Sequence, residues 1–484
     1  MFVYSERIIG KFNNISQSVK ASIAFVICSV LTKGISFFTL PLFTRLLTTE
    51  EYGYLTIYNS WFTIITIFAS LTVWGGYFNT GYVMYEGKKA GYSSAVQSLG
   101  FIISFIYLLL GILFSGKLGA YMGMPSFLVI CMFIEVISDI PYNIWMAEQR
   151  FEYKYKSVVL LTLILCIINP LLSYLFIINN DEHRVESRIV AVLLIKLSIG
   201  FFFYIYNWCR GALFYVKKIW IDMLKKNGAL IPHYLSIQIL STSDRIMIGK
   251  MCGEDDAAIY GVAYTFAMLI SLVCSGVESS FVPYVYRAIK KNDTKEIKKK
   301  TTAVVILICV CCLALICVIP DIFKYMLPES YYGSLMAIPP IAVGAFFLFL
   351  YPIFSCIEFY YGETRYVSVT SVALALLNVI MNYYSIHRWG FVAAAYTTMI
   401  CYFIMSVVHA FLMKMILHRE NGPIDIYNIR QIVFVSFAFL LLAGIIMMLY
   451  SLNFFRYLLI VIILAFFIIK RESVAQLILA IVKD

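Results

Sequence analysis

An acidic and a basic residue stand side by side in an otherwise apolar stretch of this sequence. Asp244 and Arg245 lie within 229–251, which is long enough to cross a bilayer. A charged side chain at the bilayer centre costs at least ~3 kcal/mol, so this position needs an explanation. Other polar residues lie on the same segment, among them Gln238, Ser241 and Thr242.

Two interpretations of this polar stripe remain open. Gln238, Ser241, Thr242 and Arg245 recur at helical spacing, so they form one face that is predicted to line a water-filled cleft. The alternative is that Arg245 lies near the outer end of its span and extends to the lipid headgroups, with Asp244 as a mere neighbour. The hydroxyl residues on the same face favour the cleft.

A second polar stripe occurs in the first apolar segment, residues 16–40. Ser29, Thr32, Lys33 and Ser36 recur at about 100° per residue. When the first half of the chain is shifted by 205 positions, Lys33 falls on Gln238 and Ser36 falls on Ser241. The two stripes therefore largely coincide, which favours a parallel repeat whose halves enclose the substrate.

Paired carboxylates occur in a third apolar segment. Glu135 and Asp139 are one helical turn apart, and two carboxylates this close in a low dielectric do not both ionise readily. The pair suits a coupling site for H⁺ or Na⁺. The alternatives are a structural pair bonded to Lys196 or Lys33, or a half-helix broken at Pro141. Glu278 is a weaker candidate for coupling.

Other kinds of chemistry find little support. The twelve cysteines are scattered and the five histidines are far apart, so we expect no metal site and no cofactor. The basic segment 287–300 lacks interleaved aromatic residues and is interpreted as a cytoplasmic loop near anionic lipid, with no role in nucleic-acid binding. No nucleophile/base pair or large loop indicates an enzyme.

These residues must be positioned by membrane helices. Hydrophobic residues make up 62% of the 484 residues and charged residues 13%, too few charges for a soluble protein of this size. Long apolar runs predict an all-α protein with about fourteen transmembrane helices. The predicted spans are 16–40, 53–77, 93–115, 119–147, 157–178, 189–209, 229–251, 258–286, 302–327, 334–357, 365–386, 390–413, 428–450 and 453–470.

Positive charge predicts the orientation of these spans. With both termini in the cytoplasm, 27 Lys and Arg residues lie on that side and 8 on the other. The predicted parts are an N-terminal lobe of six helices (1–210), an amphipathic cytoplasmic linker (211–228), a C-terminal lobe of six helices (229–414), and two further helices with a cytoplasmic tail (415–484).

Several segments resemble a known family. "KGISFFTLPLFTRLLTTEEYGYLTIYNSW" (33–61), "STSDRIMIGKMCGEDDAAIYGVAY" (241–264), "FVPYVYRAIKKND" (281–293) and "YYGETRYVSVTS" (360–371) are similar to the Wzx-type bacterial polysaccharide flippases. These belong to the multidrug/oligosaccharidyl-lipid/polysaccharide (MOP) exporter superfamily. The resemblance implies two six-helix lobes in a V shape, with the first and seventh helices lining a central cavity.

The resemblance also implies a function and a set of residues. The substrate would be an undecaprenyl-pyrophosphate-linked oligosaccharide, moved across the bacterial cytoplasmic membrane by alternating access with H⁺ or Na⁺ coupling. Its pyrophosphate would contact Lys33 and Arg245, with Arg45 and Lys196 as further candidates, because Arg and Lys both bind phosphate oxygens. Asp244 would orient Arg245. The chain lacks the dense arginine cluster of the lipid II branch, which puts a lipid II substrate in doubt.

The alternative within the same superfamily is a cation-coupled multidrug exporter of the MATE type. The cavity of such an exporter should favour cations. Lys33 and Arg245 argue against a cation-binding cavity, whereas Glu135, Asp139 and the 17% aromatic content do not argue against it. The partners expected of a flippase are the lipid-linked oligosaccharide, membrane lipids, and the polymerase and glycosyltransferases of the same pathway.

Overall fold

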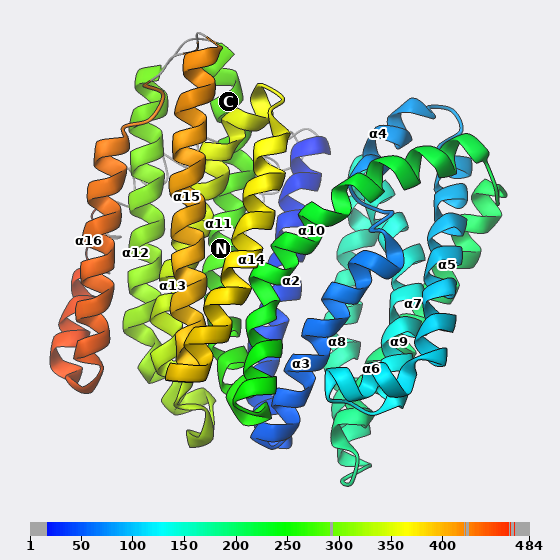
Figure 1. The fold of residues 1–484 in the computed structure, drawn as a ribbon, viewed down its shortest axis with the longest axis horizontal. Coiled ribbons are helices and arrows are strands. Elements are labelled where there is room, and N and C mark those ends of the chain that lie inside the picture. Colours follow the sequence, from blue (N-terminus) through cyan, green and yellow to red (C-terminus); the bar gives the residue numbers. More distant parts are fainter. Residues whose placement is uncertain are drawn as a thin grey trace, which may run out of the picture. The chain divides into compact units, whose positions relative to one another are not determined.

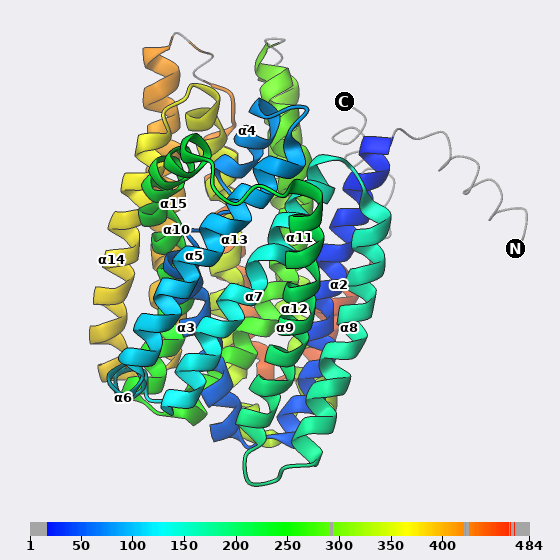
Figure 2. The same ribbon diagram turned by 90° about the vertical axis from the view of Figure 1, so that its right-hand side faces the viewer.

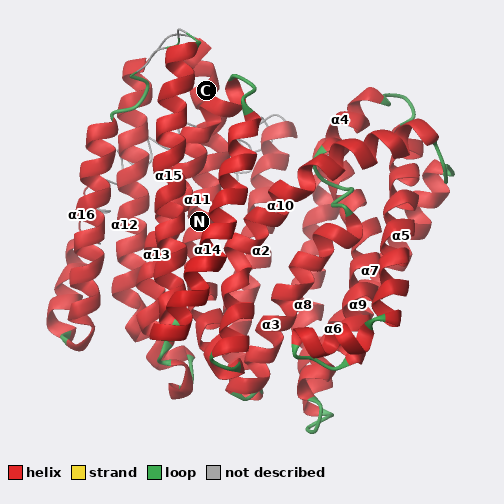
Figure 3. Ribbon diagram, in the orientation of Figure 1, coloured by secondary structure: helices red, strands yellow, loops and turns green. Residues whose placement is uncertain are grey.

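The fold is entirely helical wherever the structure is described. The computed structural model describes residues 17–290, 294–420, 422, 425–463, 465 and 469, and no strand occurs among them (Figure 3). The chain begins with α2 (Gln17–Leu46), α3 (Thr49–Ser70), α4 (Tyr77–Met84), α5 (Lys89–Leu113), α6 (Ser115–Met122), α7 (Ser126–Phe151), α8 (Tyr155–Ile178) and α9 (Arg184–Gly211). An all-α membrane fold is thereby confirmed.

The remaining helices range from three-residue 3-10 helices to a helix of 37 residues. They are α10 (Lys217–Met251), α11 (Glu254–Lys290), α12 (Thr294–Met326), η1 (Glu329–Tyr331), α13 (Ser334–Tyr360), α14 (Thr364–Trp389), α15 (Val392–Arg419), α16 (Ile429–Met448) and η2 (Leu449–Ser451). A short apolar helix, Asn453–Ile463, follows. Among the described residues, eleven helices are long and apolar enough to span a bilayer. Each of the fourteen predicted spans overlaps a helix.

Some boundaries differ from the prediction for local reasons. The span predicted at 53–77 ends at Ser70, where a turn with positive φ angles interrupts it. The span predicted at 119–147 begins at Ser126, because Gly123 in the left-handed region and the following Pro125 separate it from α6. The linker predicted at 211–228 is continuous with the seventh span, since α10 starts at Lys217.

The chain divides into two compact units. Unit 1 comprises Met1–Thr39 and Tyr58–Gln238, and unit 2 comprises Leu40–Ile57 and Ile239–Asp484. Helices α2, α3 and α10 therefore each contribute to both units. The lobe boundaries and the V shape expected from the sequence stay predictions. The cytoplasmic position of the termini also stays a prediction, and residues 1–16 and 470–484 lie outside the described part.

In unit 1, α7 packs against α9, α5 and α8 (Figure 1). Gly200 of α9 lies so close to α7 that a Cβ atom there would be 2.4 Å from the Ser138 carbonyl oxygen. Glycine thus permits a helix contact that larger residues would prevent. This close approach brings Lys196, one turn earlier on α9, to the polar face of α7.

In unit 2, α13 contacts α11, α12, α14, α15 and α16 (Figure 1), and α14 lies beside α15 (Figure 2). Side chains around most of its circumference are buried, and they form one apolar core with those of α11, α12, α15 and α16. Large apolar residues remain exposed on the outer helices, for example Phe411 at 68% and Phe434 at 72%. A lipid-facing exterior explains this exposure, which would be unfavourable in water.

Candidate functional site

A cavity of about 880 Å³ lies within unit 1. Its basic side chains are Lys33 of α2 and Arg150 at the end of α7, and no carboxylate occurs among the described residues that line it. The remaining lining residues are Cys28, Ser29, Thr32, Trp74, Gly75, Asn79, Tyr142, Asn143, Met146, Ala147, Phe151, Tyr153 and Thr162. The volume and the mixture of cations, amides and aromatic rings suit a polar, anionic ligand.

Two strained turns shape this cavity. Leu71 and Thr72 have φ angles of 50° and 44° just before Trp74, and Tyr153 has a φ angle of 54°. Bulky residues rarely adopt positive φ, and each such position costs of order 1–3 kcal/mol. The strain therefore needs support from the surrounding structure, and it keeps Trp74 and Tyr153 at the cavity.

Asn227 supports the first turn. Its side chain is fully buried, and its Nδ2 donates to the carbonyl oxygens of Leu71 and Thr72, each at 3.3 Å. Its Oδ1 accepts a 3.0 Å hydrogen bond from the backbone N–H of Tyr77, where α4 begins. One amide of α10 thus satisfies three backbone groups of the turn that carries Trp74.

The second turn is supported from α4, α8 and α9. Tyr82 donates a 2.8 Å hydrogen bond to Glu152, which also pairs with Lys154. One turn earlier on α7, the buried carboxylate of Glu148 pairs with Arg210 at 2.9 Å. These contacts fix the end of α7, and with it the position of Arg150 at the cavity.

The structure brings part of the first predicted stripe to this cavity. Ser29, Thr32 and Lys33 line it, whereas Ser36, although exposed, is not among its lining residues. The Thr32 hydroxyl donates to the Cys28 carbonyl oxygen at 2.8 Å, which leaves its lone pairs available to a ligand. Arg150, Asn79 and Asn143 were not predicted to line a cavity. Arg150 did not stand out in the sequence because basic residues at helix ends are common in membrane proteins.

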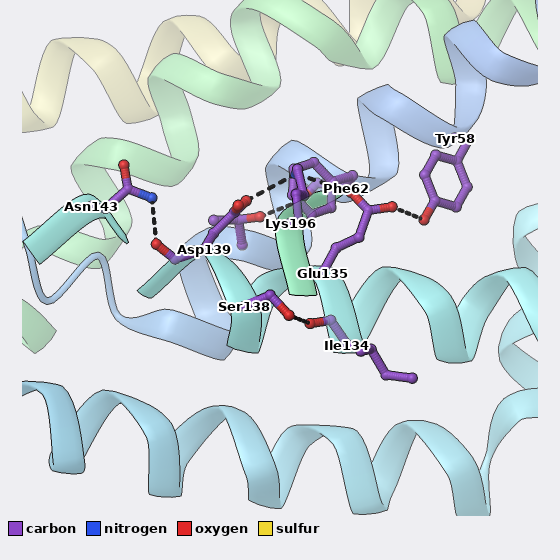
Figure 4. Close-up of polar contacts among 9 residues, drawn as sticks. Tyr58, Phe62, Ile134, Glu135, Ser138, Asp139, Asn143 and Lys196 are labelled. Carbon is purple, nitrogen blue, oxygen red and sulfur yellow. Dashed lines mark hydrogen bonds and ion pairs between the residues drawn. The ribbon is translucent and has the colours of Figure 1, made fainter. Parts of the chain in front are cut away.

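The paired carboxylates of α7 are bound by a lysine (Figure 4). Lys196 Nζ lies 2.9 Å from Glu135 and 3.0 Å from Asp139, and it sits 4.1 Å from the ring centre of Phe62. Tyr58 donates a further 2.6 Å hydrogen bond to Glu135. The geometry thus matches the alternative in which Glu135 and Asp139 form a structural pair bonded to Lys196. Whether the carboxylates also couple an ion stays a prediction.

The second predicted stripe is divided between the units. Gln238 donates a 3.0 Å hydrogen bond to Thr63 in unit 1. Ser241 and Thr242, in unit 2, are half-buried and buried respectively. Their roles in a cavity stay predictions.

Asp244 and Arg245 interact with α11 in unit 2. Asp244 is buried and accepts hydrogen bonds from the Tyr260 hydroxyl at 2.6 Å and from the Arg245 backbone N–H at 2.9 Å. The Arg245 guanidinium lies 3.8 Å from the ring centre of Tyr264. Its Nε and Nη2 are buried and have no hydrogen-bond partner among the described residues. These two donors are unused, which keeps Arg245 a candidate anion ligand.

The other predicted cations and acids lie elsewhere. Arg45 is exposed at the end of α2, where Nη2 donates to the Tyr325 carbonyl oxygen at 3.5 Å. Glu278 is half-buried on α11. Neither residue is among those that line the cavity of unit 1.

A buried amide network in unit 2 was missed by the sequence reasoning. Asn382 donates to Asn378 at 3.1 Å, and Asn378 donates to Thr398 at 3.2 Å. Thr397 is hydrogen-bonded to Asn382, and Ser243 reaches Asn378 at 3.5 Å. Two asparagines four residues apart in an apolar helix were the available signal, since such a spacing places both amides on one face.

Comparisons with known proteins agree with this fold. The family model described as "Polysaccharide biosynthesis protein" matches residues 18–289, more than half of the chain, and the model described as "MatE" matches residues 229–384. The "Lsg locus putative protein 1" of Haemophilus influenzae is 22% identical over 375 residues, covering 74% of this chain and 89% of that protein.

Solved structures of other proteins share this fold. The lipid II flippase MurJ in an inward closed conformation superposes with a TM-score of 0.66 at 14% identity, covering 94% of this chain and 100% of that one. An inward-facing multidrug resistance MATE transporter of the MOP superfamily superposes with a TM-score of 0.63 at 15% identity, covering 82% of this chain and 96% of that one. The chain therefore belongs to the polysaccharide biosynthesis protein family and has the fold of the MOP transporters, which confirms the family predicted from its sequence.

Proposed function

We propose that this chain is a flippase that moves an undecaprenyl-pyrophosphate-linked oligosaccharide across the bacterial cytoplasmic membrane. The observation that carries the proposal is the cavity of unit 1, in which Lys33 and Arg150 are not offset by any carboxylate among the described lining residues. Such a cavity attracts an anion, whereas an exporter of organic cations needs the opposite charge. The match to a polysaccharide biosynthesis family supports the same substrate class.

The cavity residues would make two kinds of contact with the substrate, one to its pyrophosphate and one to its sugar. Lys33 and Arg150 would bind the pyrophosphate, Lys as a point charge and Arg as a planar fork. The amides of Asn79 and Asn143 and the ring of Trp74 would contact the sugar. Each sugar hydroxyl would lose water partners in hydrocarbon at a cost of roughly 1–3 kcal/mol, so a hydrated cavity makes transfer feasible while the lipid tail stays in the bilayer.

Transport by alternating access requires the substrate cavity to open to each side in turn. In this scheme Arg245 is a second anion ligand. Two of its guanidinium donors are free to bind an anion, and the Tyr264 ring holds the guanidinium in place. Both termini would be cytoplasmic, and the polymerase and glycosyltransferases of the pathway would be the partners. Coupling to H⁺ or Na⁺ would supply the energy.

The experiment is a comparison of leaflets in a glycan-producing bacterium that lacks this gene. Lipid-linked repeat units should accumulate on the inner leaflet and be cleared by the wild-type chain. Lys33→Gln and Arg150→Gln should each weaken apparent substrate affinity about 10- to 100-fold, the effect of a lost charged hydrogen bond. Arg245→Ala should block export in a protein that still folds.

The matched control is Lys117→Gln, which removes an exposed cation of α6 outside the cavity. It should export as the wild type does. Equal export by Lys33→Gln, Arg150→Gln and Lys117→Gln would contradict the assignment of the cavity.

The second candidate is a MATE-type exporter of organic cations, favoured by the match over residues 229–384 and by the MATE structures. Purified protein that binds an organic cation with micromolar affinity, and whose binding a lipid-linked sugar leaves unchanged, would support this candidate over the flippase.

A further inference from the structure

A carboxylate and an imidazole form a fully buried pair in unit 2. Glu358 near the end of α13 and His409 on α15 are both 0% exposed, and Glu358 Oε1 lies 2.5 Å from His409 Nδ1. The pair lies in the tightly packed contact between α13 and α15, among side chains of the apolar core. Neither residue contributes to the cavity of unit 1.

The second polar atom of each partner is left unsatisfied. Glu358 Oε2 and His409 Nε2 are buried without a hydrogen-bond partner in the part of the chain that the structure describes. The imidazole packs edge-on against the Tyr351 ring, with the ring centres 4.7 Å apart and the ring planes at 61°. A buried polar pair that leaves two atoms unpaired is a poor way to stabilise a helix contact, because apolar residues of similar size do so at lower cost.

Other titratable groups surround the pair. Tyr351 of α13 interacts electrostatically with both Glu358 and Glu278 of α11. Cys356 interacts with Glu358, and its thiol lies 3.5 Å from the hydroxyl of Tyr427, which precedes α16. Glu278 is thus a further carboxylate that acts on this cluster through Tyr351.

The number of protons on the pair determines its net charge. With one proton shared between Glu358 and His409 the pair is neutral, whereas with none it carries a net negative charge and with two a net positive charge. A net charge is strongly disfavoured in an apolar interior. In water near neutral pH, carboxylate and imidazole together bind less than one proton on average. Burial of the pair therefore takes up a proton, and exposure to water releases it.

We propose that Glu358 and His409 form the site at which unit 2 takes up and releases one proton in each transport cycle. This proposal rests on the proposed function and names its coupling ion. Proton binding from the more acidic side neutralises the pair and permits its burial between α13 and α15. Hydration of the pair in the opposite conformation returns the proton to the other side.

The first test uses the full chain in liposomes and measures flipping of an undecaprenyl-pyrophosphate-linked oligosaccharide. An imposed pH gradient should accelerate the wild type by up to about tenfold per pH unit, as expected for one coupled proton. Glu358→Gln and His409→Gln should lose this acceleration while they continue to flip slowly without a gradient. An equal Na⁺ gradient should have no effect on any of them.

The matched control is Asp321→Asn, which removes a partly buried carboxylate of α12 that pairs with Arg456 at 2.8 Å. An arginine does not release its proton, so this pair has no proton to carry. The control should keep the wild-type response to pH. The proposal is overturned if the two variants keep the acceleration, or if only the Na⁺ gradient accelerates the wild type.

A second measurement does not depend on the substrate. The chain has five histidines, so ¹⁵N-histidine NMR in detergent can assign His409 by comparison with His409→Gln. Glu358→Gln should change the His409 signal of the wild type. An unchanged signal in that variant would overturn the proton site. Absence of flipping by the wild type under every gradient would instead contradict the proposed function.

Discussion

Removal of Lys196 tests whether the carboxylates of α7 are structural. Lys196→Met keeps the length of the side chain and deletes the positive charge between Glu135 and Asp139. Glu135 is 3% exposed and would lose the cation 2.9 Å away, although the hydrogen bond from Tyr58 would remain. Breaking a buried pair in this way costs roughly 3–5 kcal/mol, and the retained hydrogen bond favours the lower end.

Asp139 contributes less to this cost. Its side chain is 20% exposed, so water can solvate it after the lysine is removed, and we add less than ~1 kcal/mol. The expected loss is then about 3–4 kcal/mol. Because the unfolding entropy of a chain this long is about 1 kcal/mol/K, the apparent unfolding temperature in detergent should fall by about 3–4 °C.

A double-mutant cycle separates charge from packing. Lys196→Met combined with Glu135→Gln leaves no buried net charge at this position and should recover most of the lost stability, with a coupling energy of roughly 1–3 kcal/mol. Thermal unfolding of the purified variants measures these values. A Lys196→Met protein as stable as the wild type would refute the reasoning, since it would mean that Glu135 had simply taken up a proton at no cost.

Three further outcomes follow from local geometry. Asn227→Ala should lower stability by roughly 1–3 kcal/mol and reduce substrate affinity, because the turn that carries Trp74 loses its support. Asn227→Asp keeps the acceptor for Tyr77 but places a buried carboxylate against the carbonyl oxygens of Leu71 and Thr72, so it should lose at least as much in both assays. Gly200→Ala should cost roughly 1–3 kcal/mol in thermal unfolding, whereas Gly444→Ala, where a Cβ meets nothing within 4 Å, should cost nothing. A hydrogen bond from Arg419 lowers the pKa of Glu363, so the stability that this contact adds should be present above the usual glutamate range and disappear below about pH 4, which unfolding temperatures of wild type and Glu363→Gln across pH would show.

The repeat in the sequence predicted more of the fold than the hydropathy did. The ends of α2 and α10, Leu46 and Met251, lie 205 residues apart, and so do the starts of α3 and α11, Thr49 and Glu254. The same shift aligns the polar stripes of the first and seventh predicted spans in the sequence. Helix ends could be predicted because acidic and hydroxyl residues cap them, as Thr48 does through reciprocal hydrogen bonds with Glu51.

Pairings between distant helices could not be predicted in the same way. The sequence offered Lys196 or Lys33 as partners of Glu135, and nothing in the spacing distinguished them, because the choice depends on which helices α7 contacts. The glycine at position 200 decides it by letting α9 approach α7. Glu358 and His409 lie 51 residues apart on two helices, so neither stood out until α13 and α15 were seen to pack together.

The four cations predicted from the sequence to bind pyrophosphate differ in what already neutralises them. Lys196 is held by two carboxylates and offers a phosphate little net attraction. Arg245 has free donors but lies beside the buried Asp244, which reduces its field. Arg45 is exposed, where water and salt screen it. Lys33 shares a cavity with a second cation and no described carboxylate. Electrostatics therefore favours Lys33, with Arg150, as the site at which a phosphate replaces water at the lowest cost.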